Sequence, residues 1–236
     1  TAKWSQLAML NYEIDPKILQ PLVPAGTELD DWQGRTFASI VGFLFLDTRV
    51  LGVPIPYHRN FEEVNLRFYV RRKTGEGWRR AVIFIKEIVP RTAIACVARV
   101  LYGENYVALP MRHSIKLQNN TGAGPRTLSY SWWFRGTENR MEVTIGGNPK
   151  NVADGSAEAF ITEHYWGYAR QRGGRTIEYR VEHPRWRVSE VTAARLDCDV
   201  AGLYGGQFVE FLQSPASAFL ADGSEVTVSK GAVLSS

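Results

Sequence analysis

The chain has no apolar run that approaches the length of a membrane span, and no signal peptide opens it. It has only two cysteines, Cys96 and Cys198, which do not make the disulfide framework of a small secreted domain. We therefore expect a reduced, cytoplasmic protein that has no contact with the membrane.

The sequence also lacks a long basic run, although its formal net charge is +4. Because its arginines and lysines are dispersed, we expect no nucleic-acid partner. None of the four histidines stands at metal-ligand spacing with another histidine, a cysteine or an acidic cluster. No Gly-x-Ser-x-Gly segment is present, and no glycine-rich segment has the strand-to-helix context of a phosphate loop. We expect no metal ion and no cofactor.

Short β-like runs, in contrast, recur along the chain. They cover Thr36–Leu46, Phe61–Val70, Val82–Glu87, Val97–Tyr106, Thr127–Phe134, Arg140–Ile145 and Arg175–Glu182. Asp222-Gly223 predicts a further hairpin between Ala218–Leu220 and Val226–Val228. Short helices are expected near Pro16–Leu22 and Ser156–Glu163. Since no segment reads as a linker, we predict one mostly β domain over residues 1–236, with minor α content. Its antiparallel sheet should close into a barrel or cone.

The clearest alternation lies in Phe61–Val70. Val64, Leu66, Phe68 and Val70 share one face of this strand, and Glu63, Asn65, Arg67 and Tyr69 share the other. The polar face either lines a pocket or meets solvent, and alternation alone does not decide between the two. In a pocket, an isolated charge is very costly, so we expect Glu62 or Glu63 to contact an arginine.

Short motifs in a fixed order extend over nearly the whole chain. They are Asp15-Pro16-x-x-Leu19-x-Pro21-Leu22-Val23-Pro24-x-Gly26-x-x-Leu29-Asp30, Glu63-Val64-Asn65-Leu66-Arg67-x-Tyr69-Val70, Ala98-Arg99-x-Leu101-Tyr102-Gly103-x-x-Tyr106, His183-Pro184-x-Trp186 and Asp222-Gly223-Ser224-x-Val226-x-Val228. In this order the chain resembles the YqjF-like family of uncharacterised bacterial proteins, which looks distantly related to acetoacetate decarboxylase. The resemblance implies an antiparallel β-cone around a buried pocket.

The resemblance also implies where the chemistry differs. Acetoacetate decarboxylase forms a Schiff base from a lysine that follows an Arg-x-Leu-Trp-Gly-x-Pro segment. The matching segment is Arg99–Asn105, and the next two residues are Tyr106 and Val107, neither of which forms an imine. The chain therefore resembles the decarboxylase in fold and pocket, and we expect no decarboxylase activity.

Glu63 resembles a pocket glutamate of the decarboxylase and is the candidate acid/base catalyst. The candidate substrate-binding residues are Asn65, Arg67, Tyr69, Arg99 and Tyr106. The two arginines would hold a carboxylate, and Tyr106 would donate to a carbonyl oxygen. Alternatively, Tyr106 fills the space of the lysine and closes the pocket.

Three more residues are weaker candidates. Lys86 lies in an apolar run, where burial would make it a nucleophile, although such lysines more often pair or reach solvent. His164 and His183 are candidate general bases or structural histidines. We predict a protein that binds a small molecule and does acid/base work on a small carbonyl or carboxylate compound. The alternative is a non-catalytic binding or structural protein with a plugged pocket, and homo-oligomerisation is left open.

Overall fold

The structure is a computed structural model, and it describes residues 1–50, 52–54, 58–96, 103–117, 126–171 and 173–234. The strands are β1 (Ala2–Glu13), β2 (Glu28–Leu29), β3 (Phe37–Leu46), β4 (Arg49–Val50), β5 (Val53–Pro54), β6 (Phe61–Thr74), β7 (Gly77–Val89), β8 (Tyr106–Ala108), β9 (Met111–Leu117), β10 (Arg126–Phe134), β11 (Thr137–Asn151), β12 (Trp166–Arg170), β13 (Thr176–Glu182), β14 (Arg187–Asp197), β15 (Ser217–Val228) and β16 (Ala232–Val233). The short helices are α1 (Pro16–Leu19), η1 (Gln20–Leu22), α3 (Ala157–Thr162), α4 (Val200–Leu203), η2 (Gly206–Phe208) and η3 (Phe211–Gln213).

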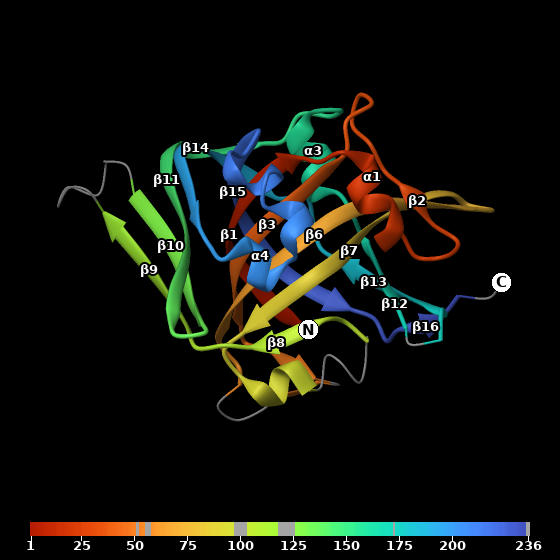
Figure 1. Cartoon of the computed structure of the whole chain (residues 1–236), viewed down its shortest axis with the longest axis horizontal. Helices are drawn as coiled ribbons and strands as arrows, with labels where there is room; N and C mark the ends of the chain where they lie inside the picture. The colour runs from red at the N-terminus through yellow and green to blue at the C-terminus, as the bar shows by residue number, and fades with distance from the viewer. Residues whose placement is uncertain (51, 55–57, 97–102, 118–125, 172, 235–236) are drawn as a thin grey trace.

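Most of these strands form one sheet that closes on itself (Figure 1). The ring runs β13-β12-β7-β6-β3-β1-β15 and returns to β13. The pairs are antiparallel except β7–β12 and β7–β8, which are parallel. The fold is therefore mostly β with a ring-like sheet and few short helices, as the sequence predicted.

The strands β14, β11, β10 and β9 continue the sheet beyond the ring (Figure 1). Buried side chains of β10 and β11 belong to the same hydrophobic cluster as side chains of β6. One core lies between this extension and the ring, where Leu66 and Phe68 belong to the same cluster as Tyr130 and Trp132. A second cluster fills the ring interior, and it includes Tyr69 of β6. Both faces of β6 are thus buried. The face that carries Glu63 is turned to the ring interior, so the solvent-facing alternative is wrong.

The two predicted helical regions are present, and each begins at a side-chain cap. The Asp15 carboxylate accepts a hydrogen bond from the backbone N–H of Lys17, and the Ser156 hydroxyl accepts one from that of Ala159. No helix in the described ranges is long and apolar enough to cross a membrane.

The hairpin predicted at Asp222-Gly223 is wrong. Strand β15 continues through both residues and pairs with β1 along most of its length. Gly223 has a φ of 79°, and a Cβ there would lie 2.2 Å from the backbone oxygen of Trp4. The dipeptide therefore marks an irregular point inside a long strand, where only glycine fits.

Candidate functional site

The site is built around Glu63, whose carboxyl group is buried on the inner face of β6. Its Oε1 accepts a hydrogen bond from Asn65 Nδ2 at 2.9 Å, and its Oε2 accepts one from the Tyr106 hydroxyl at 3.2 Å. Tyr106 reaches this place because β8 runs parallel to β7, which is itself paired with β6. The structure thus brings together three of the residues that the sequence proposed.

Three further residues complete what we call the interior polar cluster, namely Glu87, Glu104 and Tyr179. Glu87 lies directly across the β6–β7 pair from Asn65, and Tyr106 lies beside it on β8. The Tyr179 hydroxyl donates to Glu104 Oε1 at 2.7 Å. Sequence reasoning missed this group. Glu87 stands at the end of an apolar run, and its side of the sheet depends on a register shift in β6–β7.

The three carboxyl groups of the cluster are disposed to hold protons near neutral pH. Burial raises the pKa of Glu63 to about 7, against the opposing effect of its hydrogen bonds from Asn65 and Tyr106. Burial raises the pKa of Glu104 to about 8 and that of Glu87 well above its ordinary value, and the neighbouring carboxylates add to the rise for Glu87. Perturbation of this kind by burial and like charges is typical of functional sites.

Arg67 lies on the same inner face as Glu63. The expected contact of Glu62 or Glu63 with an arginine stays a prediction, because Arg99 lies outside the described residues. No ion pair in the described part of the chain joins Glu62 or Glu63 to an arginine: Glu62 instead contacts His113 Nδ1 at 2.6 Å. Burial raises the pKa of Glu63 to about 7, and the protonated form of a buried carboxyl group needs no counter-charge. The buried guanidinium of Arg67 donates from Nη2 to the carbonyl of Ile161 at 3.5 Å, and its Nε has no partner.

The structure gives Tyr69 and His164 local partners further along the ring interior. The Tyr69 hydroxyl lies 2.7 Å from Ser39 Oγ, and its ring packs against that of His164. Nε2 of His164 lies 3.2 Å from Asp30 Oδ2, and burial lowers the pKa of His164 to about 4. A neutral imidazole therefore donates to Asp30, which is the arrangement of a positioned structural histidine.

The remaining candidates lie away from Glu63. His183 stacks on Trp186 with ring centroids 4.0 Å apart. Lys86 is the cross-strand partner of Leu66, which places it on the opposite face of the sheet from the cluster. Burial lowers the pKa of Lys86, but the side chain is not turned towards Glu63. Arg99 lies outside the described residues.

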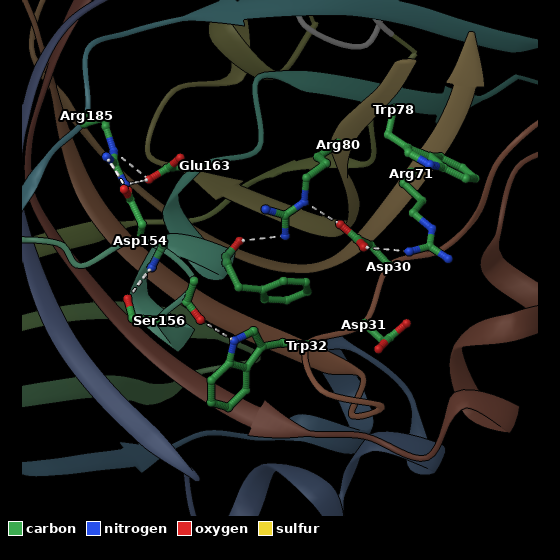
Figure 2. Close-up of a pocket in the computed structure, with 13 residues that line it drawn as sticks. Asp30, Asp31, Trp32, Arg71, Trp78, Arg80, Asp154, Ser156, Glu163 and Arg185 are labelled. Carbon is green, nitrogen blue, oxygen red and sulfur yellow. Dashed lines mark hydrogen bonds and ion pairs between the residues drawn. The ribbon is translucent and has the colours of Figure 1, made fainter.

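A surface cleft of about 380 Å³ lies on the outer side of α3 (Figure 2). Its charged groups largely neutralise one another. Arg80 donates to Asp30 at 2.7 Å, and Arg185 contacts both Asp154 and Glu163. The Trp32 indole donates to the Gly155 carbonyl. Because these groups are already partnered, the cleft is a weaker candidate than the interior polar cluster.

No group of three or more histidine, cysteine or acidic side chains in the described ranges is arranged to hold a metal ion. The three glutamates of the cluster are buried and have raised pKa values, and Glu63 and Glu104 accept hydrogen bonds from tyrosine hydroxyls. That arrangement suits hydrogen bonding and proton transfer.

Comparison with known proteins shows the family and the fold of the chain. The chain matches at 36% identity over 75 residues the "Uncharacterized protein YqjF" of Bacillus subtilis, a stretch that spans 31% of each protein. Among solved structures it resembles the enduracididine biosynthesis enzyme MppR complexed with pyruvate, with a TM-score of 0.69 at 11% identity over 99% of this chain and 90% of that one.

It also resembles an acetoacetate decarboxylase-like enzyme from Sphingomonas wittichii, with a TM-score of 0.69 at 13% identity over 99% of this chain and 92% of that one. At these identities the similarity shows a shared fold. The model of the DUF2071 family, described as "Uncharacterized conserved protein (COG2071)", matches residues 1–225. The chain therefore belongs to the DUF2071 family, on the fold of the acetoacetate decarboxylase-like enzymes.

Proposed function

We propose that this protein binds a small carbonyl or carboxylate compound inside the ring and performs acid/base chemistry on it without forming a Schiff base. The observation that carries the proposal is Glu63, which is buried, hydrogen-bonded by Asn65 and Tyr106, and on the same strand face as Arg67, whose guanidinium forms no ion pair among the described residues. A pKa of about 7 makes Glu63 suited to gain and lose a proton at neutral pH.

The roles follow from the chemistry of each group. Arg67 supplies the charge for a carboxylate, and a guanidinium is the side chain best matched to that group. Glu63 moves the proton, and the Tyr106 hydroxyl donates to the oxygen on which negative charge develops. Tyr106 and Val107 follow the segment that matches the lysine region of acetoacetate decarboxylase, so the proposed chemistry proceeds through an enol rather than an imine.

A non-catalytic binding protein is the second candidate. The observation in its favour is the contact between Tyr106 and Glu63, because the same contact would result if the tyrosine filled the former lysine space. In that case the cluster would recognise a ligand by hydrogen bonds and would move no proton.

The test is proton exchange at the carbon beside a carbonyl. A panel of short keto acids in deuterated buffer, followed by proton NMR, should include one whose exchange the wild-type protein accelerates. Glu63→Gln should lower this rate by about 100-fold or more, because it removes the group that moves the proton. Glu225→Gln, on an exposed position of β15, is the matched control and should retain the wild-type rate.

Ligand binding without any exchange would favour the non-catalytic candidate. An unchanged rate in Glu63→Gln would remove Glu63 from the chemistry. Borohydride that traps a bound keto acid on a lysine would contradict the enol route.

A further inference from the structure

Two side-chain oxygens in the interior polar cluster have no hydrogen-bond partner among the described residues. They are Oδ1 of Asn65 and Oε2 of Glu87, on residues that face each other across the β6–β7 pair. Both side chains are almost fully buried, with exposures of 1% for Asn65 and 2% for Glu87. The Asn65 amide oxygen can only accept, and the Glu87 oxygen accepts once its carboxyl group is ionised, so this point of the ring is complementary to a cationic group rich in N–H donors.

One donor nearby is unpaired in the same way. Nε of Arg67 has no partner in the part of the chain that the structure describes, and the residue is 8% exposed. Arg67 lies two positions after Asn65 on β6 and on the same face, a separation of about 7 Å along the strand. The interior therefore offers acceptors at one end and a cation at the other.

The charged groups have the same arrangement, with carboxyl groups around Asn65 and Glu87 and the guanidinium of Arg67 at the other end. Glu63 and Glu104 are near enough to Glu87 to raise its pKa when they are ionised, and the Tyr106 hydroxyl interacts with Glu87 as well. At the other end, the positive charge of Arg67 lowers the pKa of Glu63. An ammonium group placed among these carboxyl groups would allow one of them to ionise, which a neutral ligand does not.

We propose that the ring interior takes a small amino acid, with its ammonium group between Asn65 and Glu87 and its carboxylate on Arg67. The proposal rests on the proposed function, because it names the substrate class of the same site. A keto acid satisfies Arg67 but brings no N–H donor to Asn65 and Glu87, whereas an amino acid satisfies both ends.

Calorimetry with a matched series tests the proposal. The amino acids are glycine, β-alanine, 4-aminobutyrate and 5-aminopentanoate, and each is compared with the carboxylic acid of the same length that lacks the amine. We expect one length to bind at least about tenfold more tightly than its amine-free counterpart, as a charge-assisted hydrogen bond predicts.

The variants separate the two ends of the ligand. Glu87→Gln should abolish the advantage of the amine and leave the affinity for the amine-free acid unchanged, whereas Arg67→Met should weaken both. Glu225→Gln is the control and should change neither. If Glu87→Gln does not fold, the wild-type protein still provides a test. Binding of the amino acid near neutral pH should release protons, and the measured heat should then depend on the ionisation enthalpy of the buffer.

The outcomes distinguish this inference from the proposed function. Equal affinity for amino acids and amine-free acids, with dependence on Arg67, would overturn the inference and leave the proposed function standing. Amino-acid binding that Glu87→Gln does not alter would also overturn it. Failure of both series and of the keto acids to bind would overturn both proposals.

Discussion

At the scale of single residues, Tyr106 shows how one side chain shapes the chemistry of its neighbour. Its hydroxyl donates to Glu63 Oε2, and a hydrogen bond to the ionised form of an acid lowers the pKa of that acid. Burial acts in the opposite direction and is the larger effect. The pKa of about 7 is therefore a balance between these effects, and the hydrogen bond from Tyr106 keeps this pKa lower than burial alone would make it.

Tyr106→Phe should raise the pKa of Glu63 by about one pH unit, because it removes one hydrogen bond to a charged group. The measurement is carbon NMR of the glutamate carboxyl signals across a pH titration. Tyr130→Phe is the control, since Tyr130 donates to the Gln6 carbonyl from the outer core. A Glu63 titration curve that Tyr106→Phe leaves in place would show that the contact does not affect the carboxylate.

At the scale of strands, β12 and β13 depend on a close approach of an aromatic ring to a glycine. Gly167 is the cross-strand neighbour of Tyr179, and a Cβ at Gly167 would lie 2.2 Å from the tyrosine ring. The ring lies over the glycine and directs the hydroxyl to Glu104. Glycine here is thus needed for space, since its backbone has no positive φ.

Gly167→Ala should destabilise the protein by about 1–3 kcal/mol, because the added methyl group forces the buried tyrosine ring to move. It should also lower the affinity for the ligand of the interior polar cluster. Urea unfolding and calorimetry measure the two effects. Gly75→Ala is the matched control, because a Cβ at Gly75 meets nothing within 4 Å. Equal stability of the two variants would show that the ring adjusts without cost.

At the scale of the whole molecule, the buried carboxyl groups couple stability to pH. The folded state raises the pKa of Glu63 to about 7 and that of Glu104 to about 8, whereas an unfolded glutamate titrates near its ordinary value. Between those values the folded state binds more protons than the unfolded state. The stabilising contribution is therefore complete below the unfolded pKa and is lost as pH rises through the folded pKa.

The free energy of unfolding should accordingly fall as the pH rises from about 5 to about 8.5. In Glu104→Gln the slope should be smaller by about 1 kcal/mol per pH unit, because glutamine stays neutral in both states. Urea unfolding at several pH values measures the slopes. Glu225→Gln should retain the wild-type slope. A stability that rises over this range in the wild-type protein would be incompatible with protonated glutamates in the ring.

The sequence predicted the strand faces well and the strand partners poorly. Alternation correctly grouped Glu63, Asn65 and Arg67 on one face, because strand geometry is local. It did not find Glu87, whose side of the sheet depends on pairing with β6 across a register shift. The arginine contact that it predicted for Glu62 or Glu63 stays a prediction, because Arg99 lies outside the described residues. Asp222-Gly223 suggested a hairpin because the same dipeptide suits a turn and an irregular strand.

The ring has two short strand junctions, one on each side of the β12–β13 hairpin, and they bear on how a ligand could enter the interior. Strand β12 meets β7 through only two residue pairs, Trp166–Ala81 and Gly167–Val82, and β13 meets β15 through Val181–Val228 and Glu182–Thr227. The β6–β7 pair, in contrast, extends from Val64–Ile88 to Thr74–Gly77. Within the ring, the β12–β13 hairpin is thus held to its neighbours by short backbone pairings, supplemented by the ion pairs of Glu178 with Arg72 and Arg79. A molecule bound against Glu104 and Tyr179 would contact β13 and hold the hairpin closed. The hairpin would then both admit the ligand and be stabilised by it.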